Sequence, residues 1–156
     1  MAQAAFAAGC FWGVQHEFDK VKGVTKTIAG YMGGSTKNPT YEAVCTNTTG
    51  HAETVYLEYD EKIISYEELV EIFWKIHDPT QKNRQGPDVG PQYRSVIFYY
   101  TDDQRKFAET SKKNLDSSGM FKKPITTEIV AASEFYPAEE YHQHYFKKKG
   151  MGGCKA

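Results

Sequence analysis

Hydrophobic and polar positions at the start of the chain follow a strand period and then a helix period. The short apolar segment Ala4 to Ala8 predicts a strand. From Phe11 to Val21, apolar residues recur near helical spacing, and Gly23 is suited to end that helix. Cys10 therefore falls between a predicted strand and a predicted helix, at or just before the helix N-terminus.

The next segments predict two strands separated by a long loop. Val24 to Tyr31 has the pattern of a strand, whereas Ser35 to Gly50 is rich in Thr, Asn, Gly and Pro and predicts mostly loop. The segment His51 to Asp60 alternates, so its side chains point to two faces of a sheet. The more apolar face, which we expect to look inward, consists of Glu53, Val55, Leu57 and Tyr59.

A helix is predicted from Ser65 to His77. Ser65 and Glu68 have the spacing of a capping box, and Asp78-Pro79 ends the helical pattern. The apolar stripe of this helix consists of Leu69, Ile72, Phe73 and Ile76. The segment Thr80 to Arg94 contains two Gly-Pro-type breaks and predicts a long loop, and loops of that length are often functional.

The last third of the chain is predicted to contain the strand Ser95 to Tyr100, the helix Asp102 to Ser117, the strand Thr127 to Ala132 and the helix Pro137 to Lys148. Thr101 and Gln104 form a second predicted capping box. The element order is close to β-α-β-β-α-β, followed by further elements. It predicts an α+β fold, a two-layer α/β sandwich with a ferredoxin-like core and a flexible C-terminal tail, rather than a doubly wound parallel fold.

Composition narrows the class of protein. A length of 156 residues suits one domain covering residues 1–156. A mean hydropathy of -0.62, and no apolar run near the roughly 20 residues that span a bilayer, predict a soluble protein without a membrane segment. The N-terminus lacks the basic segment of a signal peptide, so we expect a cytoplasmic protein, by default a monomer. The balance of 19 basic and 20 acidic residues argues against nucleic-acid binding.

The chain has three cysteines, Cys10, Cys45 and Cys154. An odd number is a poor disulfide framework and suits a reducing compartment, and the absence of C-x-x-C spacing argues against a thioredoxin-type site or a zinc ribbon. At a helix N-terminus the Cys10 thiolate would be stabilised by the helix dipole, although a small buried cysteine would fit the same position. Cys45 is expected to be a buried structural thiol.

Several polar residues are candidates for chemistry beside Cys10. Burial would raise the pKa of Glu53 and make it a general acid, unless it is solvated or paired. His51 is either a base or, as for most single histidines, a structural residue. Tyr41 and Tyr93 lie in predicted loops and can donate O–H groups to a ligand, or pack at the surface. Asp88 shares the loop of Tyr93 and alone would be assigned to an Asx turn.

Cys154 lies beyond three glycines in the predicted mobile tail, residues 149–156. Such a thiol can reach a distant partner at a small entropic cost of loop closure, as a resolving cysteine must when it attacks a sulfenic acid. An incidental exposed thiol would have the same setting.

The chain resembles the A-type peptide methionine sulfoxide reductases over nearly its whole length. The resemblance rests on six segments in order: Gly9-Cys10-Phe11-Trp12-Gly13, Gly30-Tyr31-Met32-Gly33-Gly34, Asn38-Pro39-Thr40-Tyr41-Glu42-Ala43-Val44-Cys45, Thr49-Gly50-His51-Ala52-Glu53, Asp88-Val89-Gly90-Pro91-Gln92-Tyr93-Arg94-Ser95, and Phe135-Tyr136-Pro137-Ala138-Glu139-Glu140-Tyr141-His142-Gln143. Any one of them is weak evidence, whereas all six at family-like spacing are specific.

The resemblance implies a set of roles. Cys10 attacks the sulfoxide sulfur and becomes a sulfenic acid. Glu53 protonates the sulfoxide oxygen and Tyr41 and Tyr93 donate hydrogen bonds to it. Cys154 then forms a disulfide that thioredoxin reopens. Substrate-binding positions are Phe11 and Trp12, which enclose the methyl group, and Asp88, which orders the polar side.

The resemblance also implies that substrates are the S epimer of methionine sulfoxide, free or in oxidised proteins, and that no metal or bound cofactor is needed. The sequence departs from the family in having one cysteine near the C-terminus where many relatives have two, in ending Gly152-Gly153-Cys154 where Gly-Tyr-Cys is common, and in carrying Pro91 where Thr is frequent.

Two other classes share parts of this pattern. A thiol peroxidase also uses a sulfenic acid and a resolving cysteine, but it would place an Arg close to the reactive cysteine, and none occurs near Cys10 in the sequence. A non-enzymatic peptide-binding or metal-binding module would use Cys and His residues. Apart from His142 and His144, the five histidines lack the spacing of metal ligands.

Overall fold

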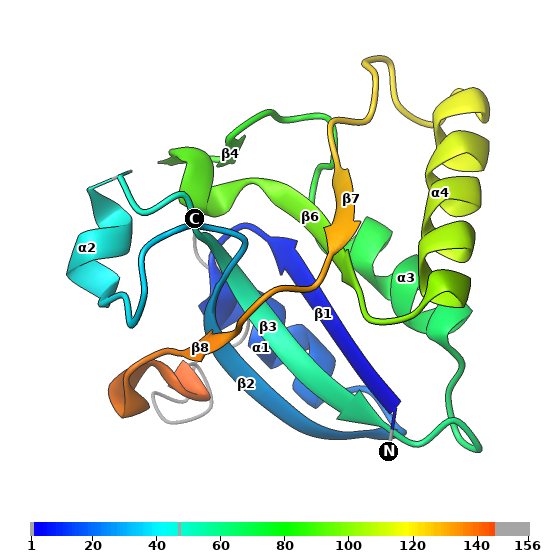
Figure 1. The fold of residues 1–156 in the computed structure, drawn as a ribbon. Coiled ribbons are helices and arrows are strands. Elements are labelled where there is room, and N and C mark those ends of the chain that lie inside the picture. The colour runs from blue at the N-terminus through cyan, green and yellow to red at the C-terminus, as the bar shows by residue number, and fades with distance from the viewer. Residues whose placement is uncertain (1, 47, 146–156) are drawn as a thin grey trace.

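The structure is a computed structural model that describes residues 2–46 and 48–145. At its centre is a six-stranded sheet in the order β7-β6-β1-β3-β2-β8 (Figure 1). Neighbouring strands are antiparallel except β6 and β7, which are parallel. The strands are β1 (Ala2–Ala8), β2 (Val24–Met32), β3 (Ala52–Tyr59), β6 (Ser95–Tyr99), β7 (Glu128–Ala131) and β8 (Tyr136–Pro137).

Four α-helices and several short elements complete the described fold. The helices are α1 (Phe11–Asp19), α2 (Tyr41–Cys45), α3 (Tyr66–Lys75) and α4 (Asp102–Ser117). The short elements are the hairpin strands β4 (Arg84–Gln85) and β5 (Asp88–Val89) and the 3-10 turns η1 (Pro91–Tyr93) and η2 (Glu140–His142). The order β1-α1-β2-β3-α3-β6, with the sheet order β6-β1-β3-β2, confirms the predicted α+β fold with a ferredoxin-like core.

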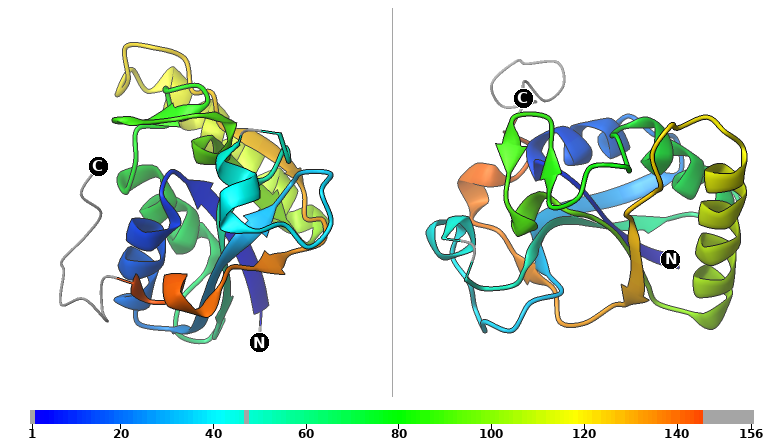
Figure 2. Two further views of the ribbon diagram at one scale, coloured as in Figure 1. Left: turned by 90° about the vertical axis from the view of Figure 1, so that its left-hand side faces the viewer. Right: turned by 90° about the horizontal axis from the view of Figure 1, so that it is seen from above.

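The larger part of the core lies between the sheet and the helices α1 and α3 (Figure 2). Phe6 of β1 is at its centre, with its ring 5.4 Å from that of Phe18 in α1 and 5.3 Å from that of Phe73 in α3. A smaller cluster on the opposite face contains Phe98 and is partly covered by Phe135, from the connection between β7 and β8. Burial of the rings of Phe6, Phe18 and Phe73 holds α1 and α3 on one side of the sheet.

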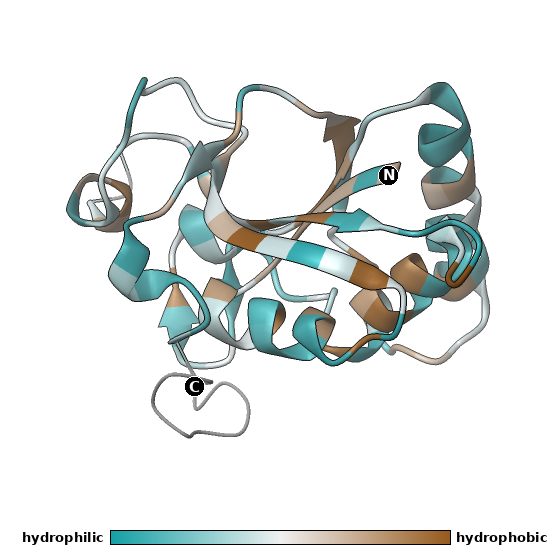
Figure 3. Ribbon diagram, turned by 90° about the horizontal axis from the view of Figure 1, so that it is seen from below, coloured by the Kyte–Doolittle hydropathy of each residue, from teal (hydrophilic) through white to brown (hydrophobic). Residues whose placement is uncertain are grey.

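The helix α4 has a different character from α1 and α3. It is the longest described helix, with 16 residues, and hydrophilic colours dominate it in Figure 3. Only Gln104, Ala108 and Ser111 are buried along it. In the described part of the chain, none of the helices combines the length and the apolar character needed to cross a bilayer.

Both predicted helix caps are present, but one is built differently from the prediction. Ser65 and Glu68 form the reciprocal capping box of α3. Thr101 caps α4 by accepting a hydrogen bond from the Gln104 amide N–H, but the Gln104 side-chain oxygen accepts from the N–H of Tyr100. The buried stripe of α3 is also shifted from the predicted one and contains Tyr66, Leu69, Val70, Phe73 and Trp74.

The predicted helix from Pro137 to Lys148 is wrong over its described part. Pro137 instead lies in β8 and pairs with Gly30 of β2. Further along, only Glu140–His142 form a 3-10 turn. The Gln143 side chain accepts a hydrogen bond from the N–H of Ala29 and donates one to the carbonyl of Ala29. These bonds to β2 replace the bonds of a regular helix, and residues 146–148 lie outside the described residues.

Two predicted loops contain short elements. Within the predicted loop Ser35 to Gly50, Thr40 caps the five-residue helix α2 by accepting a hydrogen bond from the N–H of Ala43. Within the predicted loop Thr80 to Arg94 lie the hairpin β4–β5 and the turn η1. Gly90, with a φ of 142°, allows the chain to turn between β5 and η1.

A half-buried histidine joins three elements at the end of α3. The Nδ1–H of His77 donates to the carbonyl oxygen of Phe73 at 2.8 Å, and its Nε2 lies 2.7 Å from the Ser95 hydroxyl of β6. The Ser95 hydroxyl in turn contacts that of Thr127, beside β7, at 2.7 Å. Burial lowers the pKa of His77 from 6.5 to about 4, so this arrangement contains the neutral imidazole near pH 7.

We predict that His77 makes folding sensitive to acid. Between pH 6.5 and about 4 the unfolded chain binds a proton that the folded chain resists, so stability declines as the pH falls through this window. The decline due to His77 should reach up to about 3 kcal/mol. Urea unfolding at several pH values should show this part of the decline in the wild type and not in H77Q. The control is H16Q, outside this network. An equal decline in H77Q and wild type would contradict the prediction.

Candidate active site

Cys10 lies at the junction of β1 and α1, as the sequence predicts. It is the N-cap residue of α1, and its carbonyl oxygen accepts the N–H of Val14 at 3.3 Å. Gly9 precedes it with a φ of 96°, and a Cβ at this position would lie 2.9 Å from side-chain carbons of Gln85. The glycine therefore permits both the turn and the close approach of β4 to the cysteine.

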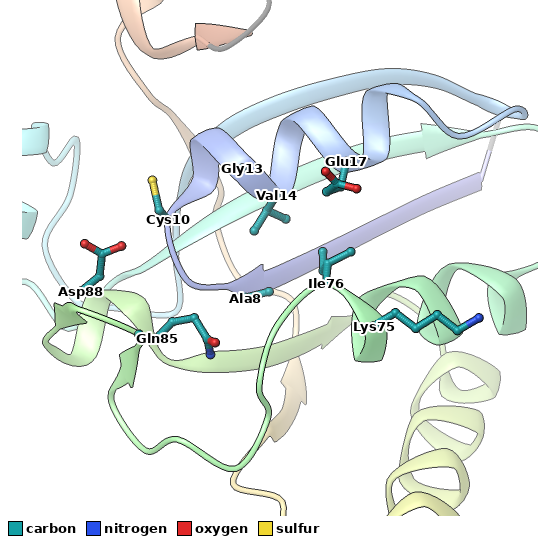
Figure 4. A pocket seen from close by; sticks show the side chains of 10 residues that line it. Ala8, Cys10, Gly13, Val14, Glu17, Lys75, Ile76, Gln85 and Asp88 are labelled. Carbon is teal, nitrogen blue, oxygen red and sulfur yellow. The ribbon is translucent and has the colours of Figure 1, made fainter. Parts of the chain in front are cut away.

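A cavity of about 320 Å³ opens beside Cys10 (Figure 4). Its walls come from α1, from the end of α3 and from the β4–β5 hairpin. Asp88 lies at the same end of the cavity as Cys10, and Lys75 lies at the other end (Figure 4). The Gln85 amide is held by two hydrogen bonds of 2.9 Å to the backbone N–H and carbonyl of Asp78. Burial raises the pKa of Asp88 above its ordinary value.

Glu53 lies beneath the start of α1, on the inward face of β3 predicted from the alternating pattern. It is only 1% exposed and pairs with Tyr31 across the β2–β3 ladder. Its Oε1 accepts a hydrogen bond of 3.1 Å from the backbone N–H of Phe11. The carboxyl group is thus anchored to the residue next to Cys10, at the end of the helix where the dipole is positive.

Two tyrosines approach the same region. Tyr41 begins α2 and Tyr93 ends η1, so neither lies in a plain loop as predicted. Burial and the negative charge of Glu53 raise the pKa of both phenols well above 10. The charges of Cys10 and Asp88 also raise the pKa of Tyr93. Both phenols remain neutral hydrogen-bond donors at physiological pH.

Aromatic rings form the third side of the site. Phe11 is 1% exposed, with its ring 5.7 Å from that of Tyr31 and 6.3 Å from that of Tyr41. Trp12 is half-buried, and its indole N–H donates to Nδ1 of His142 at 2.9 Å. The Trp12 ring also stacks on that of Tyr145, with centroids 3.9 Å apart. The orientation of Trp12 is therefore fixed from both sides.

The cavity and the polar cluster are not the same space. Of the predicted site residues, only Cys10 and Asp88 line the cavity. Glu53, Tyr41 and the aromatic pair Phe11 and Trp12 gather instead around the first turn of α1. Cys10 stands at the border of the two and is accessible from the cavity.

Sequence reasoning missed the contribution of the segment after β8. One oxygen of Glu139 accepts the Tyr31 hydroxyl at 3.0 Å and the other accepts the N–H of Tyr41 at 3.1 Å. His142 is buried between the rings of Tyr41 and Trp12. The motif Phe135 to Gln143 was the available signal, but its interpretation as a helix hid these contacts.

The remaining candidates divide into three outcomes. The prediction of a buried Cys45 is wrong, because this thiol is exposed at the end of α2, where its polar neighbour is the Tyr41 side chain. His51 is buried and structural, with Nδ1 accepting from the N–H of Gly34 and Nε2 2.6 Å from the carbonyl oxygen of Thr36. Cys154 lies outside the described residues. Within those residues, no group of three or more His, Cys, Asp or Glu side chains is arranged to hold a metal ion.

Comparisons with known proteins identify the family of the chain. The model of the peptide methionine sulfoxide reductase family matches residues 2–156. A peptide methionine sulfoxide reductase MsrA of Methanosarcina acetivorans is 60% identical over 151 residues, which cover 97% of this chain and 80% of the relative.

Solved structures show the same fold. The reduced form of Mxr1 from Saccharomyces cerevisiae matches with a TM-score of 0.88 and 36% identity over 98% of this chain and 88% of the other. Mxr1 in complex with Trx2 matches with a TM-score of 0.63 and 27% identity over 92% of this chain and 84% of the other. From its sequence, its fold and the residues gathered around Cys10, this chain belongs to the peptide methionine sulfoxide reductase family and is an enzyme of that family.

Proposed function

We propose that the enzyme reduces methionine-S-sulfoxide, free or within oxidised proteins, with Cys10 as the nucleophile. The Cys10 sulfur attacks the sulfoxide sulfur. In the net step the oxygen passes from the methionine sulfur to the cysteine sulfur, and two electrons pass in the opposite direction. Methionine is released and Cys10 becomes a sulfenic acid.

One observation carries this proposal: the N-cap thiol of Cys10 stands next to the amide that binds the Glu53 carboxyl group, at 3.1 Å. The nucleophile and the proton donor are thereby both held at the positive end of α1. Cys10 is the N-cap residue, and Glu53 is bound by the amide of the next residue, Phe11. A sulfoxide oxygen is a poor leaving group until it is protonated, and Glu53 is the acid best placed to supply that proton. The helix terminus favours the thiolate that must attack.

The tyrosines and the aromatic wall complete the proposed pocket. Tyr41 and Tyr93 supply neutral hydroxyl donors for the sulfoxide oxygen, which is supported by their strongly raised pKa values. Phe11 and Trp12 enclose the methyl group, and Asp88 orders the polar side. Because methyl group and oxygen then occupy different walls, the pocket discriminates between the two epimers of the chiral sulfur.

We extend the proposal to regeneration of the thiol. The Cys154 thiol attacks the Cys10 sulfenic acid, a disulfide forms and water leaves. Thioredoxin then reduces the disulfide through its own dithiol. Support for this partner comes from the similarity to Mxr1, which has been solved in complex with Trx2. Support for Cys154 comes from the sequence alone, where it is the cysteine that follows the glycine-rich segment.

The first prediction concerns the nucleophile. The kcat/KM of C10S on methionine-S-sulfoxide should be at least about a thousandfold lower than that of the wild type. Without the covalent nucleophile, only substrate binding and the hydrogen-bond donors remain. The measurement is thioredoxin-coupled turnover on separated epimers, with C45S as a matched control expected to stay near the wild type. Substantial turnover by C10S would refute the mechanism, and faster turnover of a hydroperoxide than of the sulfoxide would favour a peroxidase.

The second prediction concerns the proton donor. E53Q should slow the reductive step by about a hundredfold or more, the usual contribution of a general acid. The glutamine side chain has the same length as that of Glu53 and can still accept the N–H of Phe11, so the fold should be unchanged. Single-turnover formation of methionine under excess enzyme measures this step directly. An unchanged rate would move the acid role to one of the tyrosines.

The third prediction separates reduction from regeneration. C154S should release about one methionine per enzyme at the normal rate and then stop when thioredoxin is the only reductant. Rapid-quench measurement of the first turnover, followed by the steady state, distinguishes the two phases. Continued thioredoxin-driven cycling would show that another thiol resolves the sulfenic acid, and C45S/C154S would then test Cys45.

A further inference from the structure

A second cavity, of about 560 Å³, shares β4 with the cavity beside Cys10. Its walls come from the segment leading into β4 and from the α4–β7 connection, which both lie along the top of the molecule in Figure 1. Its rim carries four exposed cationic side chains and one carboxylate: Lys82, Arg84, Lys122 and Lys123, with Asp78. This is a local excess of positive charge on a chain whose net charge is -1.

Within residues 2–46 and 48–145, no ion pair neutralises the positive charge at this cavity. None of the four cations forms an ion pair with another residue in the part of the chain that the structure describes. The one carboxylate, Asp78, is already hydrogen-bonded to neighbouring residues of its own segment. Its oxygens accept hydrogen bonds from the N–H and hydroxyl of Thr80 and from the Gln81 amide. The lysines therefore remain available to a negatively charged partner.

The two walls of the cavity are held together by hydrogen bonds. The N–H of Thr126 donates to the carbonyl of Pro79 at 2.8 Å, and the Thr126 hydroxyl reaches the carbonyls of Pro79 and Gln81 at 3.1 Å. The N–H of Gly86 donates to the Gln81 side chain at 2.8 Å. These bonds join the segment 78–86 and the α4–β7 connection into one frame, from which the lysines project. A rigid frame lowers the entropic cost of binding a partner to several lysines at once.

The same frame connects the cationic rim to the active site. Arg84 lines the cationic cavity and the next residue, Gln85, lines the cavity beside Cys10. Consecutive side chains of a strand point to opposite faces, so β4 is a shared wall. An extended peptide spans roughly 3.3 Å per residue. A substrate chain whose oxidised methionine reaches Cys10 can continue past β4 toward the cationic rim, and four to six extended residues of such a chain span roughly 13 to 20 Å.

We propose that this cationic cavity binds an acidic segment of the protein substrate, next to the oxidised methionine in sequence. The occupant is a peptide rather than a small anion, because the cations are spread around an open rim that also contains apolar surface. Met120, 72% exposed, and the half-buried Phe121 supply that surface. The inference rests on the proposed reduction of protein-bound sulfoxide and adds a preference among its substrates.

The test compares peptides that contain one methionine-S-sulfoxide and differ only in a block of Glu, Gln or Lys about four to six residues away, on either side. At about 0.01 M salt, kcat/KM should be at least fivefold higher for a Glu peptide than for its Gln counterpart in one of the two placements, and lowest for Lys. The difference should disappear near 1 M salt, where the Debye length falls to about 3 Å.

The double variant K122E/K123E should lose this preference while its kcat/KM on free N-acetylmethionine sulfoxide stays within about twofold of the wild type. The matched control, K22E/K26E, makes the same change in net charge at exposed positions near the start of β2. Equal kcat/KM for Glu and Gln peptides in both placements would overturn the proposal, as would an equal loss of preference in the control.

A binding measurement separates this proposal from the proposed function. A Glu peptide with unoxidised methionine, followed by fluorescence anisotropy, should bind K122E/K123E at least fivefold more weakly than the wild type, and this does not depend on turnover. Absence of sulfoxide reduction by the wild type, with this difference in binding intact, would reject the proposed mechanism alone. Equal binding to the two proteins would reject the docking site alone.

Discussion

The contact between the first amide of α1 and the buried carboxyl group of Glu53 is the interaction on which the site depends. A free helix N-terminus has N–H groups that require acceptors, and a buried carboxyl group requires donors. Each satisfies the other at this point. Because the contact is made through the backbone of Phe11, it also fixes where Cys10, one residue earlier, must stand.

The sheet supplies the other half of this constraint. β1 lies between β3 and β6, so its end is fixed by ladders on both sides, and the chain leaves it at Gly9 against Gln85 of β4. The alanines of β1 are poor strand formers by propensity, yet pairing on both edges holds them in the centre of the sheet. Ala4 and Ala8 lie with Phe6 in the core on the α1 side of the sheet, whereas Ala5 and Ala7 belong to the cluster on the opposite face.

Sequence reasoning succeeded where the determining forces are local. The alternation in β3 placed Glu53 on the inward face, and the spacing of Ser65 and Glu68 identified the start of α3. It failed where distant groups decide the structure. The segment after Pro137 has helix-forming residues, but Glu139 and Gln143 bond to α2 and β2, which no local pattern reveals. The prediction of a buried Cys45 fails for the same reason, because Val44 is the only buried residue of the described helix α2.

The chemistry of a small pocket limits what it can recognise. A methyl sulfoxide offers one oxygen, one methyl group and one chiral sulfur. In the proposed mechanism the residues around Cys10 therefore distinguish epimers, but they have no contact that would distinguish one oxidised protein from another. Discrimination between proteins must therefore come from surface beyond the pocket. Such surface is effective only if it is rigidly tied to the reacting group, because a loosely attached cation costs entropy when it binds. The bonds that hold Gln85 against Asp78 and Gly86 against Gln81 meet that requirement, since they join the wall of the reacting cavity to the frame of the lysines.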